Sequence, residues 1–119
     1  MHKAPSCSSL KIRVRDLAVL ADVGINPDEV GRRQPLIIGV ELTVAARNPD
    51  TIDETIDYRR IAQTVETLAE VRIPLIESFA RKLGMECLSW PMVAEALISI
   101  DKPFALTRGL AGIELKLQR

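Results

Sequence analysis

A chain of 119 residues with 47% hydrophobic residues fits one domain with a real core. Its 16 acidic and 16 basic residues balance to a net charge near zero, which argues against non-specific binding to nucleic acid or to an anionic membrane. One Trp, one Tyr and two Phe are too few for a base-stacking platform. The longest apolar runs are too short to span a bilayer. We therefore expect neither nucleic acid nor a membrane as a partner.

The cysteine and histidine content excludes several kinds of chemistry. Cys7 and Cys87 do not form the pattern of a disulfide framework, so two thiols in a reducing compartment are expected. Residues 1–9 lack the apolar segment of a signal peptide, so we expect a flexible tail there, a single domain over residues 10–119 and a cytoplasmic protein. His2 is the only histidine, so the domain lacks a histidine base and the ligands of a zinc site. We expect no metal and no cofactor.

The first predicted elements are two strands. A strand runs from residue 10 to Gly24, with apolar and charged residues alternating along its first half. The alternation changes register after Asp16, which predicts a bulge there. A loop rich in turn-forming residues over 24–31 leads to a second alternating strand over residues 34–45. The two strands are expected to pair as a long hairpin.

Two helices follow in the predicted order. A helix over residues 58–71 has apolar residues along one face, and either Thr55 or Asp57 can cap its N-terminus. Pro74 separates it from a second helix over residues 75–88, whose apolar residues also recur at helical spacing. The helices are therefore expected to cover a sheet with their apolar faces.

Alternating strands over residues 93–100 and 111–117 complete the chain. The order β-β-α-α-β-β predicts an α+β fold with an antiparallel sheet, because strands and helices do not alternate. Four strands in an open sheet leave two exposed edges, and joining sheets between subunits into a closed barrel is one way to cover them.

Four polar residues stand out by their context. Glu77 interrupts an apolar run at the start of the second helix, where the helix N-terminus favours a carboxylate. Lys102 follows an apolar strand end and precedes Pro103. Tyr58 is the only tyrosine and opens the first helix, and Glu29 lies in the glycine-bounded loop. Each also has an ordinary explanation as a solvated charge or a half-buried aromatic residue, so none supports a functional claim singly.

In order and spacing, these residues resemble the dihydroneopterin aldolase family over residues 10–117. Glu29 follows Gly24 by five residues, as in the loop between the first two strands of that family. The other segments similar to the family are 55–58 (Thr-Ile-Asp-Tyr), 75–80 (Leu-Ile-Glu-Ser-Phe-Ala), 102–106 (Lys-Pro-Phe-Ala-Leu) and 112–115 (Gly-Ile-Glu-Leu). Each motif is weak alone, but their correct order on a matching frame is a specific signal.

The resemblance implies the tunnelling fold, an α+β fold with two helices on one face of an antiparallel sheet. In this fold four subunits join their sheets into a barrel, and two such rings often stack. It implies a homotetramer or homo-octamer with pterin sites between subunits.

The resemblance also implies roles for individual residues. Glu77 would anchor the pterin by accepting two parallel N–H bonds, helped by main-chain groups of Ile76 and, from a neighbouring subunit, of Ile56 and Tyr58. Lys102 would be the central acid–base group, acting on the side-chain hydroxyl and the ring nitrogen through water. Tyr58 would help deliver a proton to the carbon left behind.

Glu29, by the same resemblance, would orient the side-chain hydroxyls or the catalytic water. The reaction implied is the retro-aldol cleavage of 7,8-dihydroneopterin into 6-hydroxymethyl-7,8-dihydropterin and glycolaldehyde, an aldehyde-lyase step of folate biosynthesis. The dihydropterin ring carries a C=N bond next to the side chain, so the substrate itself accepts the electrons of the breaking bond. A lysine Schiff base or a metal is then unnecessary.

The sequence departs from the family pattern in three places. Asn26, Pro27 and Asp28 stand where the family often has aromatic residues, Pro74 where an Asn is common, and Phe79 where the family has Leu. These changes concern selectivity for the substrate side chain and leave the four principal polar residues in place.

Two alternatives to the aldolase remain open. An epimerase of the same family would cleave the same bond and re-form it, and a triphosphate substrate would favour a basic rim such as Arg32, Arg33 and Arg108. A pterin-binding ring protein without catalysis is the other, and the presence of both Lys102 and Tyr58 argues against it.

Overall fold

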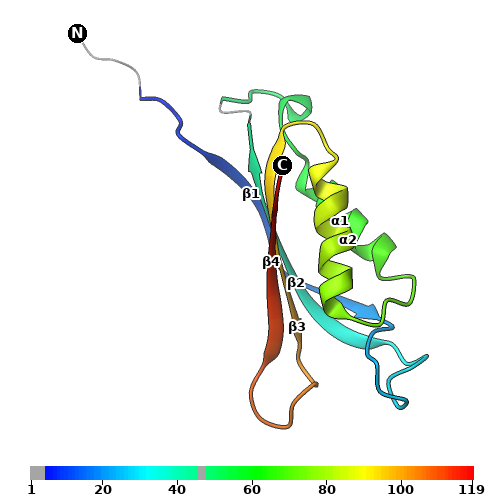
Figure 1. The fold of residues 1–119 in the computed structure, drawn as a ribbon. Coiled ribbons are helices and arrows are strands. Elements are labelled where there is room, and N and C mark those ends of the chain that lie inside the picture. Colours follow the sequence, from blue (N-terminus) through cyan, green and yellow to red (C-terminus); the bar gives the residue numbers. More distant parts are fainter. Residues whose placement is uncertain (1–4, 46–47) are drawn as a thin grey trace.

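The computed structural model describes residues 5–45 and 48–119. Its strands and helices follow the predicted β-β-α-α-β-β order, with a short 3-10 helix η1 before the first α-helix (Figure 1). The elements are β1 (Leu10–Ala21), β2 (Gln34–Val44), η1 (Ile52–Glu54), α1 (Tyr58–Leu68), α2 (Ile76–Leu88), β3 (Val93–Lys102) and β4 (Ala111–Gln118). Residues 5–9 form neither helix nor strand, and His2 lies outside the described residues.

The four strands form one antiparallel sheet in the order β1-β2-β3-β4, and both helices lie on the same face of it (Figure 1). The predicted α+β fold is confirmed, whereas the joining of sheets between subunits stays a prediction. None of the helices in the described part of the chain is long and apolar enough to cross a membrane.

The core lies between the sheet and the helices. Alternate residues of β2 and β3 point into it and are fully or almost fully buried, as are the apolar faces of α1 and α2. The largest buried side chains include Trp90, Phe79, Leu36, Ile38, Leu42, Ile61, Leu83, Ile98 and Ile100. Each such side chain contributes about 1.5–3 kcal/mol of transfer free energy. Burial at every second strand residue therefore fixes which face of the sheet the helices cover.

The predicted bulge in β1 is confirmed. The β1–β2 register shifts between Val14 and Leu17, and Asp16 has a positive φ of 57°. The extra residue keeps apolar side chains on the helix side, with Val14 before the bulge and Leu17 and Val19 after it. Without it, the second half of β1 would turn its polar residues inward.

The ends of two elements, β1 and α1, lie three residues before the positions expected from the sequence. β1 ends at Ala21 rather than Gly24, and α1 ends at Leu68, three residues early. The chain after α1 runs beside the end of β1, where Ile73 N donates to Asp22 O at 3.1 Å. This bond and the bond from Gly24 N to Pro74 O at 2.7 Å, together with the proline itself, oppose a longer helix. Asp57 is the N-cap of α1, accepting from Arg59 N at 3.0 Å, so the expected choice between Thr55 and Asp57 is decided.

Candidate functional site

An ion pair at the end of β3 is the first feature of the candidate site. Lys102 is the last residue of β3, and its Nζ lies 2.9 Å from Glu29 Oε2. The two side chains are only 16% and 14% exposed, although they come from positions 73 residues apart. The sheet therefore brings together two of the residues that the sequence singled out.

The Glu29 carboxylate accepts hydrogen bonds on both oxygens. Oε1 accepts from Asn26 Nδ2 at 2.9 Å and from Asn26 N at 3.4 Å, and Oε2 accepts from Gln34 Nε2 at 2.9 Å besides Lys102. These four donors occupy about all the lone-pair positions of a carboxylate. The Gln34 hydrogen bond first, and then Lys102, lower the pKa of Glu29 to about 2. Glu29 is therefore ionised at neutral pH and is held as a fixed acceptor beside the lysine.

The Glu29 carboxylate packs directly against the main chain of Gly24. The φ of Gly24 is +114°, and a Cβ at this position would lie 2.2 Å from Glu29 Cδ. Gly24 N also donates to Pro74 O at 2.7 Å. Because Pro74 precedes Glu77 by three residues, the ion pair and the start of α2 belong to the same end of the subunit.

Glu77 lies in the first turn of α2 and is exposed to solvent. The N-cap residue Leu75 offers no side-chain hydrogen bond to the helix, so main-chain N–H groups of this turn remain open to an acceptor. Ile76, the first residue of the helix, is half-buried. This end of α2 is therefore an accessible carboxylate with unpaired main-chain donors beside it.

Tyr58 and Ile56 lie at the opposite end of the subunit. Tyr58 opens α1 and is 63% exposed, while Ile56 just before it is buried. Arg60, two residues after Tyr58 in α1, stacks 4.2 Å above the Trp90 ring, which follows the C-terminus of α2. Figure 1 shows these segments at the upper end of the sheet, where β3 begins and from which it runs down to the lower loops.

The length of β3 indicates how far the end of the subunit with Lys102 lies from the end with Tyr58 and Ile56. Nine steps along this strand from Val93 to Lys102 correspond to about 30 Å. The structure thus brings Glu29 and Lys102 together with the Glu77 segment nearby, and it leaves Tyr58 far from them within one chain.

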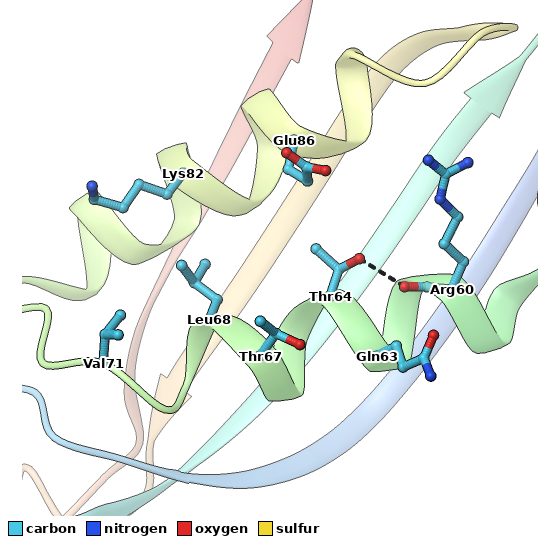
Figure 2. Close-up of a pocket in the computed structure, with 8 residues that line it drawn as sticks. All are labelled: Arg60, Gln63, Thr64, Thr67, Leu68, Val71, Lys82 and Glu86. Atoms are coloured by element: carbon cyan, nitrogen blue, oxygen red, sulfur yellow. Dashed lines mark hydrogen bonds between the residues drawn. The ribbon is translucent and has the colours of Figure 1, made fainter.

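The loop between β1 and β2, residues 22–33, is called the Glu29 loop below. A surface hollow of about 500 Å³ lies at the ion pair and is lined by the Glu29 loop, the start of β2 and the residues after Lys102. A larger hollow, of about 760 Å³, lies between α1 and α2, and Figure 2 shows the side chains that line it. Thr64 Oγ1 donates there to Arg60 O at 2.7 Å, and Lys82 and Glu86 point away from each other. The larger hollow contains none of the residues singled out by the sequence, so we place the candidate site at the ion pair.

Residues 5–45 and 48–119 contain no group of three or more His, Cys, Asp or Glu arranged to hold a metal ion. Cys87 is buried in the core, and burial raises the pKa of its thiol to about 12. This thiol therefore stays protonated and out of reach of a substrate.

Comparison with known proteins identifies the family. The sequence matches the family profile described as dihydroneopterin aldolase, FolB, over residues 12–118. The chain belongs to the dihydroneopterin aldolase family. Among curated proteins, a dihydroneopterin triphosphate 2'-epimerase from Pseudomonas aeruginosa is 27% identical over 100 residues, which cover 81% of each chain.

Solved structures of the dihydroneopterin aldolase family share the fold. FolB from Vibrio cholerae superposes with a TM-score of 0.85 at 23% identity, covering 94% of this chain and 99% of that one. Dihydroneopterin aldolase from E. coli, solved in complex with neopterin, gives a TM-score of 0.84 at 22% identity, covering 90% and 97%. A Burkholderia dihydroneopterin aldolase bound to guanine gives a TM-score of 0.80 at 23% identity, covering 93% and 92%.

Two residues that hold Glu29 were not recognised from the sequence. Asn26 and Gln34 donate to the two oxygens of its carboxylate. The available signal was their distance from Glu29: Asn26 lies three residues before it in the loop bounded by Gly24 and Gly31, and Gln34 lies five residues after it at the start of β2. A loop of this kind brings polar side chains within reach of a central carboxylate, but spacing alone does not show which of them turn toward it.

Proposed function

We propose that this chain is a dihydroneopterin aldolase that cleaves 7,8-dihydroneopterin into 6-hydroxymethyl-7,8-dihydropterin and glycolaldehyde in folate biosynthesis. The observation that carries the proposal is the Lys102–Glu29 ion pair at a sheet end that also holds Glu77, in a member of the dihydroneopterin aldolase family. Family members of known structure bind neopterin or guanine, whose shared 2-amino pyrimidinone edge suits a carboxylate.

The proposed reaction needs only proton transfers from the protein. The hydroxyl on the second side-chain carbon loses its proton, the bond between the first and second side-chain carbons breaks, and glycolaldehyde leaves. The electron pair moves into the ring C=N bond, and the first side-chain carbon then takes up a proton. Lys102 acts on the hydroxyl and the ring nitrogen through water, and Tyr58 helps deliver the proton to carbon.

The structure refines the part proposed for Glu29. Four donors already occupy its oxygens, so a substrate hydroxyl would have to displace one of them. We therefore assign Glu29 to holding Lys102 and, through it, the catalytic water. Glu77 anchors the pterin ring with its exposed carboxylate, helped by main-chain groups of Ile76.

The proposed site is completed by a second copy of the chain. Tyr58 and Ile56 precede Arg60, which stacks on Trp90 near the start of β3, whereas Lys102 ends this strand of about 30 Å, so they are too far apart to act on the same substrate within one subunit. The exposed edges of β1 and β4 can pair between copies, which would form the ring of four or eight subunits.

The aldolase is tested by incubating the pure protein with 7,8-dihydroneopterin and following glycolaldehyde. Stoichiometric glycolaldehyde and 6-hydroxymethyl-7,8-dihydropterin are the expected products. Epimer accumulating without glycolaldehyde would contradict the aldolase, and pterin binding without any turnover would indicate a binding protein.

An epimerase acting on the triphosphate is the second candidate, because the Pseudomonas aeruginosa relative has that name. Arg32 lines the hollow at the ion pair and suits a phosphate group. Arg33 Nη2 is instead engaged by the main-chain oxygens of Leu20 and Ala69, at 2.9 and 3.1 Å. Parallel incubations with dihydroneopterin triphosphate and with unphosphorylated 7,8-dihydroneopterin show which of the two the protein converts.

A further inference from the structure

A charged pair ties the Glu29 loop to the connection between the helices, outside the residues proposed to touch the substrate. Asp22 follows β1, and Arg72 lies between α1 and α2. Arg72 Nη1 donates to Asp22 Oδ1 at 2.6 Å, and Arg72 Nη2 donates to Gly24 O, also at 2.6 Å. One guanidinium group therefore holds a side chain and a main-chain oxygen of the loop at the same time.

Main-chain hydrogen bonds pair the same two segments. Ile73 N donates to Asp22 O at 3.1 Å, and Gly24 N donates to Pro74 O at 2.7 Å. α2 begins two residues after Pro74, with Glu77 in its first turn. The loop is therefore hydrogen-bonded to the segment that leads directly into the helix turn with the proposed anchor of the pterin ring.

Asp22, the other member of the pair, is connected through the Glu29 loop to Lys102, the proposed acid–base group. Asp22 Oδ1 also accepts from Gly31 N at 3.2 Å, which closes the loop that contains Glu29. The Glu29 carboxylate rests against Gly24, so close that a Cβ there would overlap it. A continuous series of contacts thus runs from Arg72 through Gly24 and Glu29 to Lys102.

We propose that Arg72 and Asp22 are positioning residues that set the distance between the Lys102–Glu29 pair and Glu77. This inference rests on the proposed function, in which Glu77 holds the ring while Lys102 acts on its side chain. A misplacement of about 1 Å between an anchored substrate and its acid–base group can reduce the rate about 10²-fold.

Arginine suits this position better than lysine does. Its planar guanidinium donates in two directions, toward Asp22 and toward Gly24 O, whereas an ammonium group on a flexible chain has no fixed fork. The two side chains are 30% and 22% exposed, so the pair is partly hydrated. We expect its removal to leave the chain folded while it disturbs the geometry of the site.

Steady-state kinetics with 7,8-dihydroneopterin test the inference in Arg72→Lys, Arg72→Gln, Asp22→Asn and the Arg72→Gln/Asp22→Asn double variant. We expect kcat to fall about 10- to 100-fold while KM stays within about threefold, because all variants keep the Glu77 carboxylate that is proposed to bind the ring. The double variant should lose no more than the worse single variant, since the two residues act as one unit. Unchanged kcat in both Arg72 variants, or independent losses that multiply, would overturn the inference.

Arg119→Lys is the matched control. Arg119 also joins main-chain oxygens of a helix–strand connection, donating to Val93 O at 2.7 Å, to Trp90 O at 2.9 Å and to Leu88 O. We expect this variant to lose stability like the Arg72 variants and to keep its kcat within about twofold. An equal fall of kcat in Arg119→Lys would show a general effect of stability and contradict a positioning role.

Hydrogen exchange separates this inference from the proposed function. In Arg72→Gln we expect the hydrogen-bonded main-chain amides of the loop (Gly24 and Gly31) and of the segment between the helices with the first turn of α2 (Ile73 and Phe79) to exchange at least about tenfold faster, with residues 93–102 unaffected. A wild-type protein that turns over no dihydroneopterin would refute the proposed function. The exchange data would still show whether Arg72 and Asp22 hold the Glu29 loop to the segment between the helices. Unchanged exchange in both segments would overturn the inference.

Discussion

Lys102 Nζ and Glu29 Oε2 lie 2.9 Å apart, and this pair joins the end of β3 to the loop that follows β1. The two side chains are mostly shielded from solvent, and Glu29 is held by Asn26 and Gln34 as well. A lysine whose position is fixed in this way can act on one side of a bound ligand. The pair is therefore the natural starting point for mutagenesis.

Lys102→Ala should reduce turnover of dihydroneopterin by at least about 10²-fold, the lower end for loss of a general acid–base group. Binding of neopterin should be largely kept, because the proposed anchor is Glu77. Initial rates of glycolaldehyde release and fluorescence titration with neopterin measure the two effects. Lys82→Ala, on the exposed face of α2, is the control and should turn over normally. Unchanged turnover in Lys102→Ala would refute the assigned role.

Glu29→Gln should remove one cause of the fall in the free energy of unfolding at low pH. The pKa of Glu29 in the folded chain is about 2, below the ordinary value of 4.5, so its ionised form stabilises the fold. This contribution is complete above about pH 4.5 and is lost as the pH falls toward 2. We expect the variant to be about 1.5–3 kcal/mol less stable at pH 7, the range for hydrogen bonds to a charged group.

Urea unfolding at fixed protein concentration, repeated between pH 7 and pH 2, measures that difference. The difference should shrink across the lower part of the range. A constant difference at every pH would show that the Glu29 carboxylate is not stabilised as the structure indicates.

Gly24→Ala should be much more damaging than Gly31→Ala. Both glycines have a positive φ, of +114° and +77°, so both variants carry backbone strain on the order of 1 kcal/mol. Only at Gly24 would the new Cβ overlap the Glu29 carboxylate, whereas nothing lies within 4 Å at Gly31. We expect Gly24→Ala alone to lower kcat, measured beside thermal unfolding of both variants. Equal kcat values in the two variants would contradict support of Glu29 by Gly24.

Glu77→Ala should lose affinity for the pterin before it loses catalysis. The carboxylate is exposed at the start of α2, so its removal leaves no buried group unpaired and should leave the fold intact. Neopterin titration should show at least about tenfold weaker binding, the range for a charge-assisted pair of hydrogen bonds. Glu86→Ala, an exposed Glu in the last turn of the same helix, should bind as the wild type does. Equal affinity in both variants would exclude Glu77 as the anchor.

Mixing inactive variants tests whether the site spans two chains. Tyr58→Ala and Lys102→Ala should each be inactive alone, and mixed oligomers formed by refolding them together in equal amounts should recover activity. If Tyr58 and Lys102 come from different chains, about a quarter of the sites in a random mixture contain both residues. No recovery, in oligomers shown to contain both variants, would contradict a shared site.

Much of this fold could be predicted from the sequence because burial repeats with the period of each element. Alternation at every second residue predicted β2 and β3 within two residues at each end, and the change of phase after Asp16 predicted the bulge. The end of α1 was predicted wrongly, because it depends on main-chain bonds to the distant residues Asp22 and Gly24. Such bonds leave no periodic pattern.

For the candidate site, the residue types along the chain indicated which side chains are available for chemistry. A domain without histidine apart from His2 depends on Lys, Tyr, Asp and Glu side chains, and the order of four motifs indicated which ones. The folded chain was needed to show that Lys102 reaches Glu29 and that Asn26 and Gln34 hold the Glu29 carboxylate. It was also needed to show that Tyr58 lies at the other end of the subunit. The physical reason is that antiparallel pairing of β1, β2 and β3 sets which strand ends meet, and spacing along the chain does not.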